Sequence, residues 1–172
     1  LAKALVKLDK TPMKPQYTKT VKEMLNIMGR HSSFGLKIVF ANMWLFKGLV
    51  KKLFTKLSTD TNALLTSTFA FTVINGGNQT NVIPNHVEAN INVRIAPFNT
   101  PEEVVEHIKK VIDDDDIIIT TNDINKMYGE CDFNLPGYEI VKETTIETYP
   151  NTVVAPFIML GGTDARHYNE IS

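Results

Sequence analysis

An amide and a guanidinium group occur in one short stretch of the sequence, where they could bind a carbonyl or a carboxylate. Asn81 lies in a loop that begins with Asn75-Gly76-Gly77 and ends at Pro84, and Arg94 follows on the polar face of a predicted strand. An arginine side chain can bind a carboxylate through two parallel hydrogen bonds. Asparagine is also a common turn residue, and arginine on a strand is often only solvated. The spacing alone therefore leaves both interpretations open.

A second candidate site follows an apolar run near the end of the sequence. Gly161-Gly162-Thr163-Asp164 is typical of a turn between a strand and a helix. Backbone N–H groups and the threonine hydroxyl at such a turn can hold an anionic group. The alternative is a glycine-rich turn in which Thr163 or Asp164 caps the helix and binds no ligand.

Two runs of alternating apolar and polar residues flank the Asn81 loop and predict strands over 66–75 and 86–96. In the first run we expect one buried face to contain Phe69, Phe71 and Val73. In the second run the polar face includes Arg94. The apolar face of the second run contains Val87, Ala89, Ile91, Val93 and Ile95.

The rest of the chain is predicted to be mostly helical. Amphipathic spacing predicts helices over 1–9, 18–29, 36–57, 101–112 and 138–149. Thr100 and Glu103 form a capping box at the start of the fourth helix. The residues of the fifth helix that we expect to face inward are Ile140, Val141, Thr144 and Thr145.

Two further strands are expected, and they complete the predicted topology. One is a short strand over 117–121, and the other is the apolar run 153–160, which is typical of a strand covered on both faces. The order of the elements matches most of a ferredoxin-like sandwich. No strand precedes the first helix, which is one reason to expect a fragment of a longer polypeptide.

Two motifs resemble segments of one enzyme family. Gly76-Gly77-x-x-x-Asn81-Val-Ile-Pro84, followed by Asn92-Val-Arg94-Ile-x-Pro97, resembles the lid, or dimerisation, domain of the M20 family of zinc metallopeptidases and aminoacylases. The stretch 153–168, with Gly161-Gly162-Thr163-Asp164, is similar to the segment in which that family's chain returns to its catalytic domain. The carboxypeptidase S-like branch is the most similar, and the resemblance covers essentially the whole chain.

The resemblance implies an α+β fold with two parts. Residues 1–135 would form a ferredoxin-like lid, or dimerisation, domain: an antiparallel sheet with helices on one face and a helical insert over about 12–62. Residues 136–172 would form part of an α/β catalytic domain, with a helix, a buried strand and the Gly-Gly-Thr-Asp turn. The chain would then be a fragment of a metal-dependent hydrolase, either a carboxypeptidase or an N-acyl amino acid amidohydrolase.

The resemblance also implies roles for individual residues. Asn81 and Arg94 would hold the substrate carbonyl or carboxylate across a homodimer. The terminal carboxylate would be held by Gly161, Gly162, Thr163 and Arg166. The substrate would be a peptide or an N-acyl amino acid with a free carboxylate. The full-length protein would hold two zinc ions with ligands outside this sequence, so we expect no metal ligand, no catalytic residue and no hydrolysis in this chain alone.

The composition of the chain limits which functions and which covalent cross-links are possible. The net charge of −1 over 172 residues argues against the basic surface that nucleic-acid binding requires. The single cysteine, Cys131, cannot form an intrachain disulfide, and the compartment stays open. A stand-alone dimerisation module, or a regulatory module that binds a small molecule without catalysis, is the alternative function.

The stretch from Met24 to Thr59 contains no acidic residue. Its basic residues are Arg30, Lys37, Lys47, Lys51, Lys52 and Lys56. A basic amphipathic stretch can lie on a membrane surface. Packing of this insert on the lid or on a partner subunit is the favoured interpretation, and membrane contact is not expected. His31-Ser32-Ser33 resembles a motif of the M20 lid that contains a trans-acting histidine, but it lies inside the insert, so we assign it no role.

Overall fold

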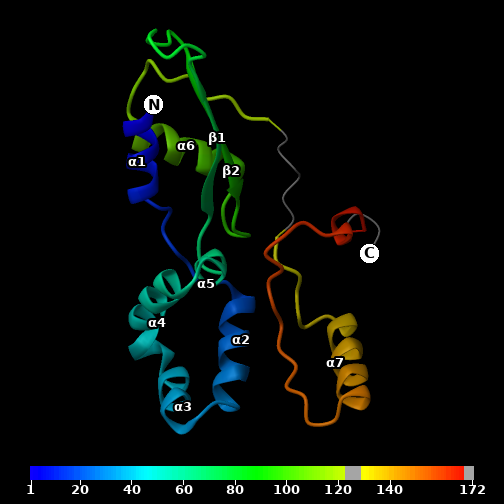
Figure 1. The fold of residues 1–172 in the computed structure, drawn as a ribbon. Coiled ribbons are helices and arrows are strands. Elements are labelled where there is room, and N and C mark those ends of the chain that lie inside the picture. Colours follow the sequence, from blue (N-terminus) through cyan, green and yellow to red (C-terminus); the bar gives the residue numbers. More distant parts are fainter. Residues whose placement is uncertain (123–128, 169–172) are drawn as a thin grey trace. The chain divides into compact units, whose positions relative to one another are not determined.

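The computed structural model describes residues 1–122 and 129–168, apart from the side chains of residues 165 and 166. Its α carbons group into two compact units. The first unit combines residues 1–14 with 66–127, and the second combines 15–65 with 128–172. The described residues form helices and a two-stranded antiparallel sheet (Figure 1), so the predicted α+β class is confirmed.

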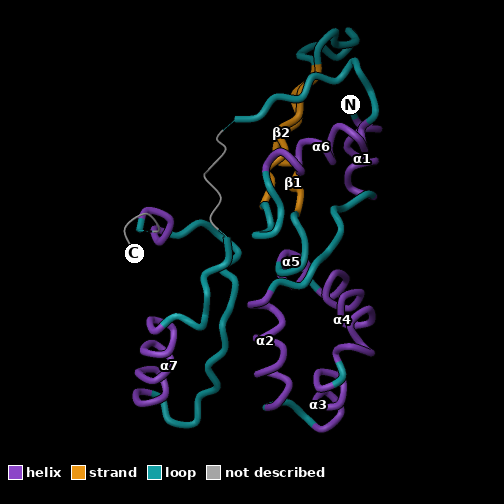
Figure 2. Tube along the Cα trace, turned by 180° about the vertical axis from the view of Figure 1, so that it is seen from behind, coloured by secondary structure: helices purple, strands orange, loops and turns teal. Residues whose placement is uncertain are grey.

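The first unit is a β-hairpin with two helices on one face (Figure 2). Its elements are α1 (Ala2–Lys10), β1 (Thr68–Gly76), β2 (Val87–Arg94) and α6 (Pro101–Ile112). The helices contribute buried core residues, namely Ala4, Leu8, Val104, Ile108 and Ile112. Phe69, Phe71, Ile91 and Val93 of the hairpin pack against them. The full ferredoxin-like topology stays a prediction, because the described residues pair only two strands.

The start of α6 agrees with the predicted capping box. The Thr100 hydroxyl accepts a hydrogen bond from the backbone N–H of Glu103, and the Glu103 carboxylate accepts one from the N–H of Thr100. Two of the N–H groups that a helix start leaves without an intrahelical partner are thereby satisfied. The observed bounds, Pro101–Ile112, equal the predicted ones.

A β-bulge at Thr72 changes the predicted faces of β1. Phe71 lies opposite Ile91, but Val73 lies opposite Asn90, so Thr72 is an extra residue in the ladder. Every residue of β1 beyond the bulge therefore faces the side opposite to simple alternation. The prediction that Val73 shares a face with Phe69 and Phe71 is wrong, since Val73 lies on the polar face of the hairpin.

The second unit contains the helical insert and the C-terminal part of the chain. Its elements are α2 (Lys19–Arg30), α3 (Phe34–Ala41), α4 (Met43–Leu57), α5 (Thr59–Ala63), α7 (Pro136–Thr148) and the 3₁₀ helix η1 (Asp164–His167). The buried core of this unit consists of Val21, Met24, Leu25, Val50, Leu64 and Leu65. Within the described ranges, no helix combines the length and the apolarity needed to cross a membrane.

The helix predicted over 36–57 is two helices. Asn42 separates α3 from α4, with φ −112° and ψ 41°, and its side-chain amide donates to the Ile38 carbonyl at 2.8 Å. Asparagine side chains compete with the backbone for hydrogen bonds in this way, which favours a break in a helix. The sequence pattern missed the break because apolar residues continue on both sides of it.

Three predictions about packing are wrong, and they concern helix α7 and the strands expected over 117–121 and 153–160. The side chains of Ile140 and Val141 in α7 are each 63% exposed instead of inward-facing. Residues 153–160 and 117–121 belong to no strand in the part of the chain that the structure describes. In 153–160, three partly buried residues pack against the core of the second unit, namely Ala155, Ile158 and Leu160.

Glu130 ties the C-terminal part of the second unit to α2. Its carboxylate oxygen Oε2 accepts from the backbone N of Thr20 at 2.9 Å and from the Thr20 hydroxyl at 2.6 Å. A negative charge is stabilising at the N-terminus of a helix, where N–H groups lack intrahelical partners. The two residues are 110 positions apart in the chain, so no local sequence pattern predicts this contact.

Candidate functional site

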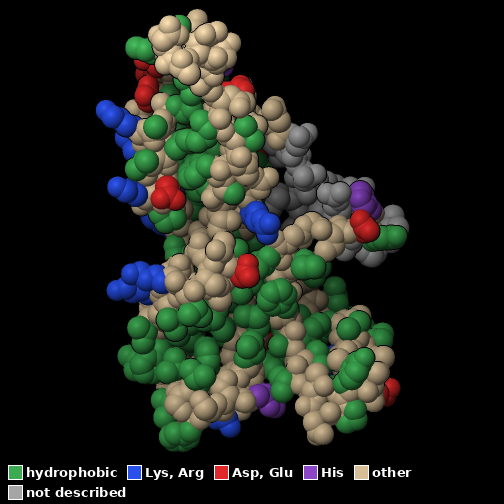
Figure 3. Space-filling view, in the orientation of Figure 1, with side chains coloured by type: hydrophobic (Ala, Val, Ile, Leu, Met, Phe, Trp, Pro, Cys, Tyr) green, Lys and Arg blue, Asp and Glu red, His purple; other side chains and the backbone are tan. Residues whose placement is uncertain are grey.

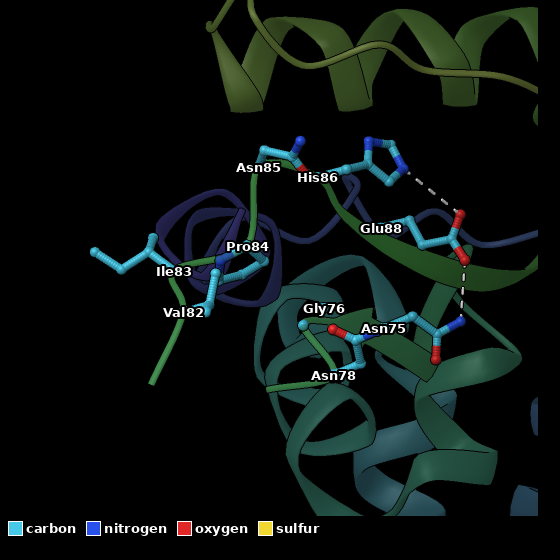
Figure 4. A pocket seen from close by; sticks show the side chains of 10 residues that line it. Asn75, Gly76, Asn78, Val82, Ile83, Pro84, Asn85, His86 and Glu88 are labelled. Carbon is cyan, nitrogen blue, oxygen red and sulfur yellow. Dashed lines mark hydrogen bonds and ion pairs between the residues drawn. The ribbon is translucent and has the colours of Figure 1, made fainter. Parts of the chain in front are cut away.

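The loop between β1 and β2 encloses an open pocket of about 620 Å³ (Figure 4). Val82 and Ile83 lie on one side of the pocket, and Asn75, His86 and Glu88 lie on the other. Asn81 belongs to the same loop, but it does not line the pocket. The loop therefore presents an apolar and a polar side to anything that enters it.

Two glycines give the loop its shape. Gly77 has φ +74°, a backbone conformation that other residues adopt only with strain. At Gly76, a Cβ atom would stand 2.8 Å from Cγ1 of Val87 on the opposite strand. The chain therefore turns at Gly77, as the Gly-Gly pair predicts, and the two strands approach closely at Gly76.

Glu88 is the centre of the polar side of the pocket. Its Oε1 accepts a hydrogen bond from the Asn75 amide at 3.0 Å, and its Oε2 lies 4.0 Å from Nε2 of His86. Asn75 and Glu88 are cross-strand neighbours in the ladder. The exposed carboxylate orients both side chains, although exposed pairs of this kind add little stability. Sequence reasoning missed the group, because the pairing depends on the bulge at Thr72.

Asn81 and Arg94 lie toward opposite ends of the hairpin. Arg94 is opposite Thr68 at the base, whereas Asn81 is in the loop beyond the Gly76–Val87 pair. The strand from Val87 to Arg94 alone covers about 23 Å at ~3.3 Å per residue. Both side chains are exposed, and Arg94 is on the polar face as predicted. The structure therefore does not bring the two predicted substrate-binding residues together within one copy of the chain.

A buried polar network fixes the base of the hairpin near Arg94. Ser67, which is 1% exposed, donates from Oγ to Oδ1 of Asn99 and accepts from the backbone N of Ala96, both at 2.9 Å. Asn99 in turn donates to the Glu103 carboxylate at 3.1 Å. Hydrogen bonds from Asn99 and then from the Thr100 backbone lower the pKa of Glu103. The segment that follows Arg94 is thereby anchored to the start of α6.

The second predicted group lies in the second unit. Gly161, Gly162 and Thr163 are exposed, and they precede η1, so the predicted turn before a short helix is present. A Cβ atom on Gly161 would meet open space. The Arg166 side chain lies outside the described residues, although its backbone belongs to η1. The exposed N–H groups and the Thr163 hydroxyl leave this turn accessible to an anionic group.

The described side chains do not form a metal centre. Across residues 1–122 and 129–168, no three His, Cys, Asp or Glu side chains gather in an arrangement that could hold a metal ion. The resemblance implies two zinc ions for a longer protein, with ligands outside this sequence. That expectation stays a prediction about residues outside this sequence.

Comparison with known proteins identifies relatives along the whole chain. The family model described as a peptidase dimerisation domain, of M20 type, matches residues 1–118. The probable carboxypeptidase S-like 2 of Dictyostelium discoideum is 34% identical over 98% of this chain and 32% of its own length. The N-fatty-acyl-amino acid synthase/hydrolase PM20D1 of Mus musculus is 32% identical over 100% of this chain and 35% of its own.

A human relative has a similar identity to this chain and is matched over a similar share of its length. The N-fatty-acyl-amino acid synthase/hydrolase PM20D1 of Homo sapiens is 30% identical over 100% of this chain and 35% of its own length. The chain thus spans about a third of the length of the curated relatives it matches. No solved structure matches it.

Proposed function

Because this chain belongs to the M20 peptidase family through its dimerisation domain, we propose that it supplies substrate-carboxylate recognition and dimerisation to a metal-dependent hydrolase. The substrate class is a peptide or an N-acyl amino acid with a free carboxylate. The names of the relatives, a carboxypeptidase S-like protein and N-fatty-acyl-amino acid synthase/hydrolases, support this class. The observation that carries the proposal is the placement of an exposed amide and an exposed guanidinium on one hairpin.

Each residue has a defined task in the proposed site. The Arg94 guanidinium binds a carboxylate through its two-pronged fork, and the Asn81 amide donates to a carbonyl oxygen. Thr163 and the N–H groups after Gly161 and Gly162, with Arg166, hold the terminal carboxylate. In the longer protein, two zinc ions would polarise the scissile carbonyl and activate water. The task proposed for this chain is to bind and orient the substrate, while ligands outside this sequence would hold those ions.

The length of the hairpin constrains how a dimer uses these residues. Arg94 lies about 23 Å along the strand from Val87, and Asn81 lies in the loop beyond Val87, so the hairpin is longer than a dipeptide-sized substrate. One substrate molecule can contact both residue types only if they come from two copies of the chain. We therefore propose that each site of a homodimer takes Asn81 from one copy and Arg94 from the other.

A mixed-dimer experiment tests this arrangement. Asn81→Ala and Arg94→Ala variants of the full-length enzyme are assayed separately and after random mixing of their subunits. Each variant alone is expected to be strongly impaired, whereas the mixture recovers about a quarter of wild-type activity, because half of the dimers are mixed and each carries one intact site. Activity that stays at the level of the separate variants would contradict the arrangement.

The charge of Arg94 is tested with a pair of substrates. Arg94→Ala should lower kcat/KM for an N-acyl amino acid by about 30- to 4,000-fold, equivalent to ~2–5 kcal/mol. The loss should be much smaller for the matching carboxamide, which has no negative charge. Arg30→Ala, an exposed arginine of the insert, is the matched control. Wild-type kinetics in Arg94→Ala would remove Arg94 from the site.

The proposal as a whole is tested on the 172-residue chain beside the full-length protein that contains it. Both are assayed for bound zinc and for hydrolysis of an N-acyl amino acid. Two zinc ions and activity in the longer protein, with neither in the shorter chain, are the expected result. A longer protein without metal and without activity would instead favour a dimerisation or regulatory module.

A further inference from the structure

Helix α4 has two apolar sides, and only one of them is used in the core. Met43, Phe46, Val50 and Phe54 belong to or pack on the core of the second unit. Four leucines spaced four residues apart form a second row, which is called the leucine stripe here. Its members Leu45, Leu49, Leu53 and Leu57 are 61%, 61%, 53% and 64% exposed. This spacing places all four on neighbouring turns of the same side of the helix.

More exposed apolar side chains lie close to the stripe in the chain. Trp44, at the start of α4, is 81% exposed, and Phe34, at the start of α3, is 80% exposed. Figure 3 shows hydrophobic side chains gathered over α3 and α4 on the face in view. Single exposed leucines are ordinary on protein surfaces, but exposed apolar side chains that gather on one face indicate a site of interaction.

The charged side chains of α3 and α4 are all of one sign. Lys52 and Lys56 project on the flank of the leucine stripe, by the helical repeat, and both are exposed. Lys37 and Lys47 add exposed positive charge on α3 and α4. No acidic residue occurs from Met24 to Thr59, so nothing on α3, α4 or the end of α2 neutralises them.

The combination of exposed leucines and flanking lysines indicates which kind of partner binds the leucine stripe. A second copy that docked through the same stripe would bring its lysines against these lysines, with no carboxylate on either stripe to pair with them. A partner with an apolar interior and a negatively charged surface would bind both the leucines and the lysines. Leucine, tryptophan and phenylalanine side chains enter the acyl boundary of a bilayer, while lysines contact anionic headgroups.

We propose that the leucine stripe, with Trp44 and the flanking lysines, docks the protein on an anionic phospholipid surface. The helix would lie in the plane of the interface, with the leucines inserted among the acyl chains and the lysines at the headgroups. The proposal does not depend on the hydrolase function. It revises the interpretation that the insert only packs on the lid or on a partner subunit.

Trp44 makes docking directly measurable, because it is the chain's single tryptophan. The protein is titrated with vesicles of phosphatidylcholine, with or without about 30% phosphatidylserine. The emission of Trp44 should shift to the blue and the protein should sediment with the anionic vesicles. Binding should be weaker to neutral vesicles and at ~0.5 M salt, where screening shortens the reach of the charges.

Two double variants test the two features separately. Leu49→Gln with Leu53→Gln should lower partitioning about tenfold or more, since two apolar side chains no longer leave water. The control is Ile140→Gln with Val141→Gln on α7, two side chains that are also exposed, at 63% each. Lys52→Gln with Lys56→Gln should lower partitioning to anionic vesicles about tenfold. Lys109→Gln with Lys110→Gln on α6 is the matched charge control.

Several results would overturn the proposal. No spectral shift and no sedimentation of the wild-type chain would do so, as would equal losses in the control and stripe variants. A wild-type dimer that the leucine variant converts to monomers, without vesicle binding, would assign the stripe to a second copy. Binding by the 172-residue chain that is absent from the full-length protein would show that other parts of that protein cover the stripe.

Discussion

The buried hydroxyl of Ser67 connects the end of the hairpin to the start of α6. It connects the N–H of Ala96 to the amide of Asn99, and Asn99 connects to the capping carboxylate of α6. The neighbouring hydroxyl of Thr66 donates to the Met13 carbonyl at 2.9 Å. Arg94 precedes Ala96 by two residues, so its backbone position depends on this network.

Ser67→Ala should destabilise the fold by about 1–3 kcal/mol, because it removes the hydrogen bonds that Ser67 makes to the buried N–H of Ala96 and to Oδ1 of Asn99. Equilibrium unfolding in urea measures the loss. Ser33→Ala is a suitable control, since Ser33 makes no side-chain hydrogen bond at the start of α3. An equal effect of the two substitutions would mean that the network is not stabilising.

Tyr17 predicts a dependence on alkaline pH. Its hydroxyl donates to the Lys47 carbonyl at 3.1 Å, and burial raises the pKa of Tyr17 to about 12. A folded-state pKa above the unfolded value stabilises the protein below about pH 10, and this contribution is lost as the pH rises toward 12. Burial also raises the pKa of Tyr138, so ultraviolet titration should show a late-ionising signal that is reduced by one tyrosine in Tyr17→Phe. Ionisation of Tyr17 near pH 10 would contradict the burial effect.

Secondary structure was predictable wherever its signal is local. The capping box gave the bounds of α6, and amphipathic spacing placed α1 and α2 within one or two residues. The bulge at Thr72 and the break at Asn42 were not predictable from pattern, since apolar residues continue through both. The candidate residues were placed correctly in a loop and on a polar face. Their separation and the Glu88 contacts required the register of the strands.

The contribution of the hydrogen bonds between Glu130 and α2 to stability can be measured. Glu130→Gln should cost about 1–3 kcal/mol, because it removes a charged acceptor from two hydrogen bonds at the start of a helix. Thermal or urea unfolding measures the change. Glu143→Gln, on the exposed helix α7, is the control and should change the free energy of unfolding by less than about 0.5 kcal/mol. Equal effects would assign Glu130 no structural role.

At the scale of the whole molecule, a small net charge conceals a strong segregation of charge. The net charge is −1, but the 36 residues from Met24 to Thr59 carry only positive charges. Local surface potential, not net charge, governs association with charged partners. We therefore expect the protein to bind a cation exchanger at neutral pH and low salt, despite its acidic sequence pI of about 6.5.

The retention should depend on the insert. Lys52→Gln with Lys56→Gln should elute at clearly lower salt, whereas Lys109→Gln with Lys110→Gln should elute close to the wild type, because the second pair lies near acidic residues of α6 and the following turn. Elution conductivity is the measurement. Passage of the wild-type protein through the column without retention would contradict the segregation of charge at the surface.

The extra residue at Thr72 has a consequence for comparing relatives. In most hairpins, insertions and deletions fall in the loop, because the strands cannot change length without turning their side chains over. Here the ladder already absorbs one additional residue inside β1. A relative that lacks the bulge should therefore align with a single-residue gap at Thr72, within the strand. An alignment that moves this gap into the glycine-rich loop would pair Val73 and Ile74 with residues of the wrong face.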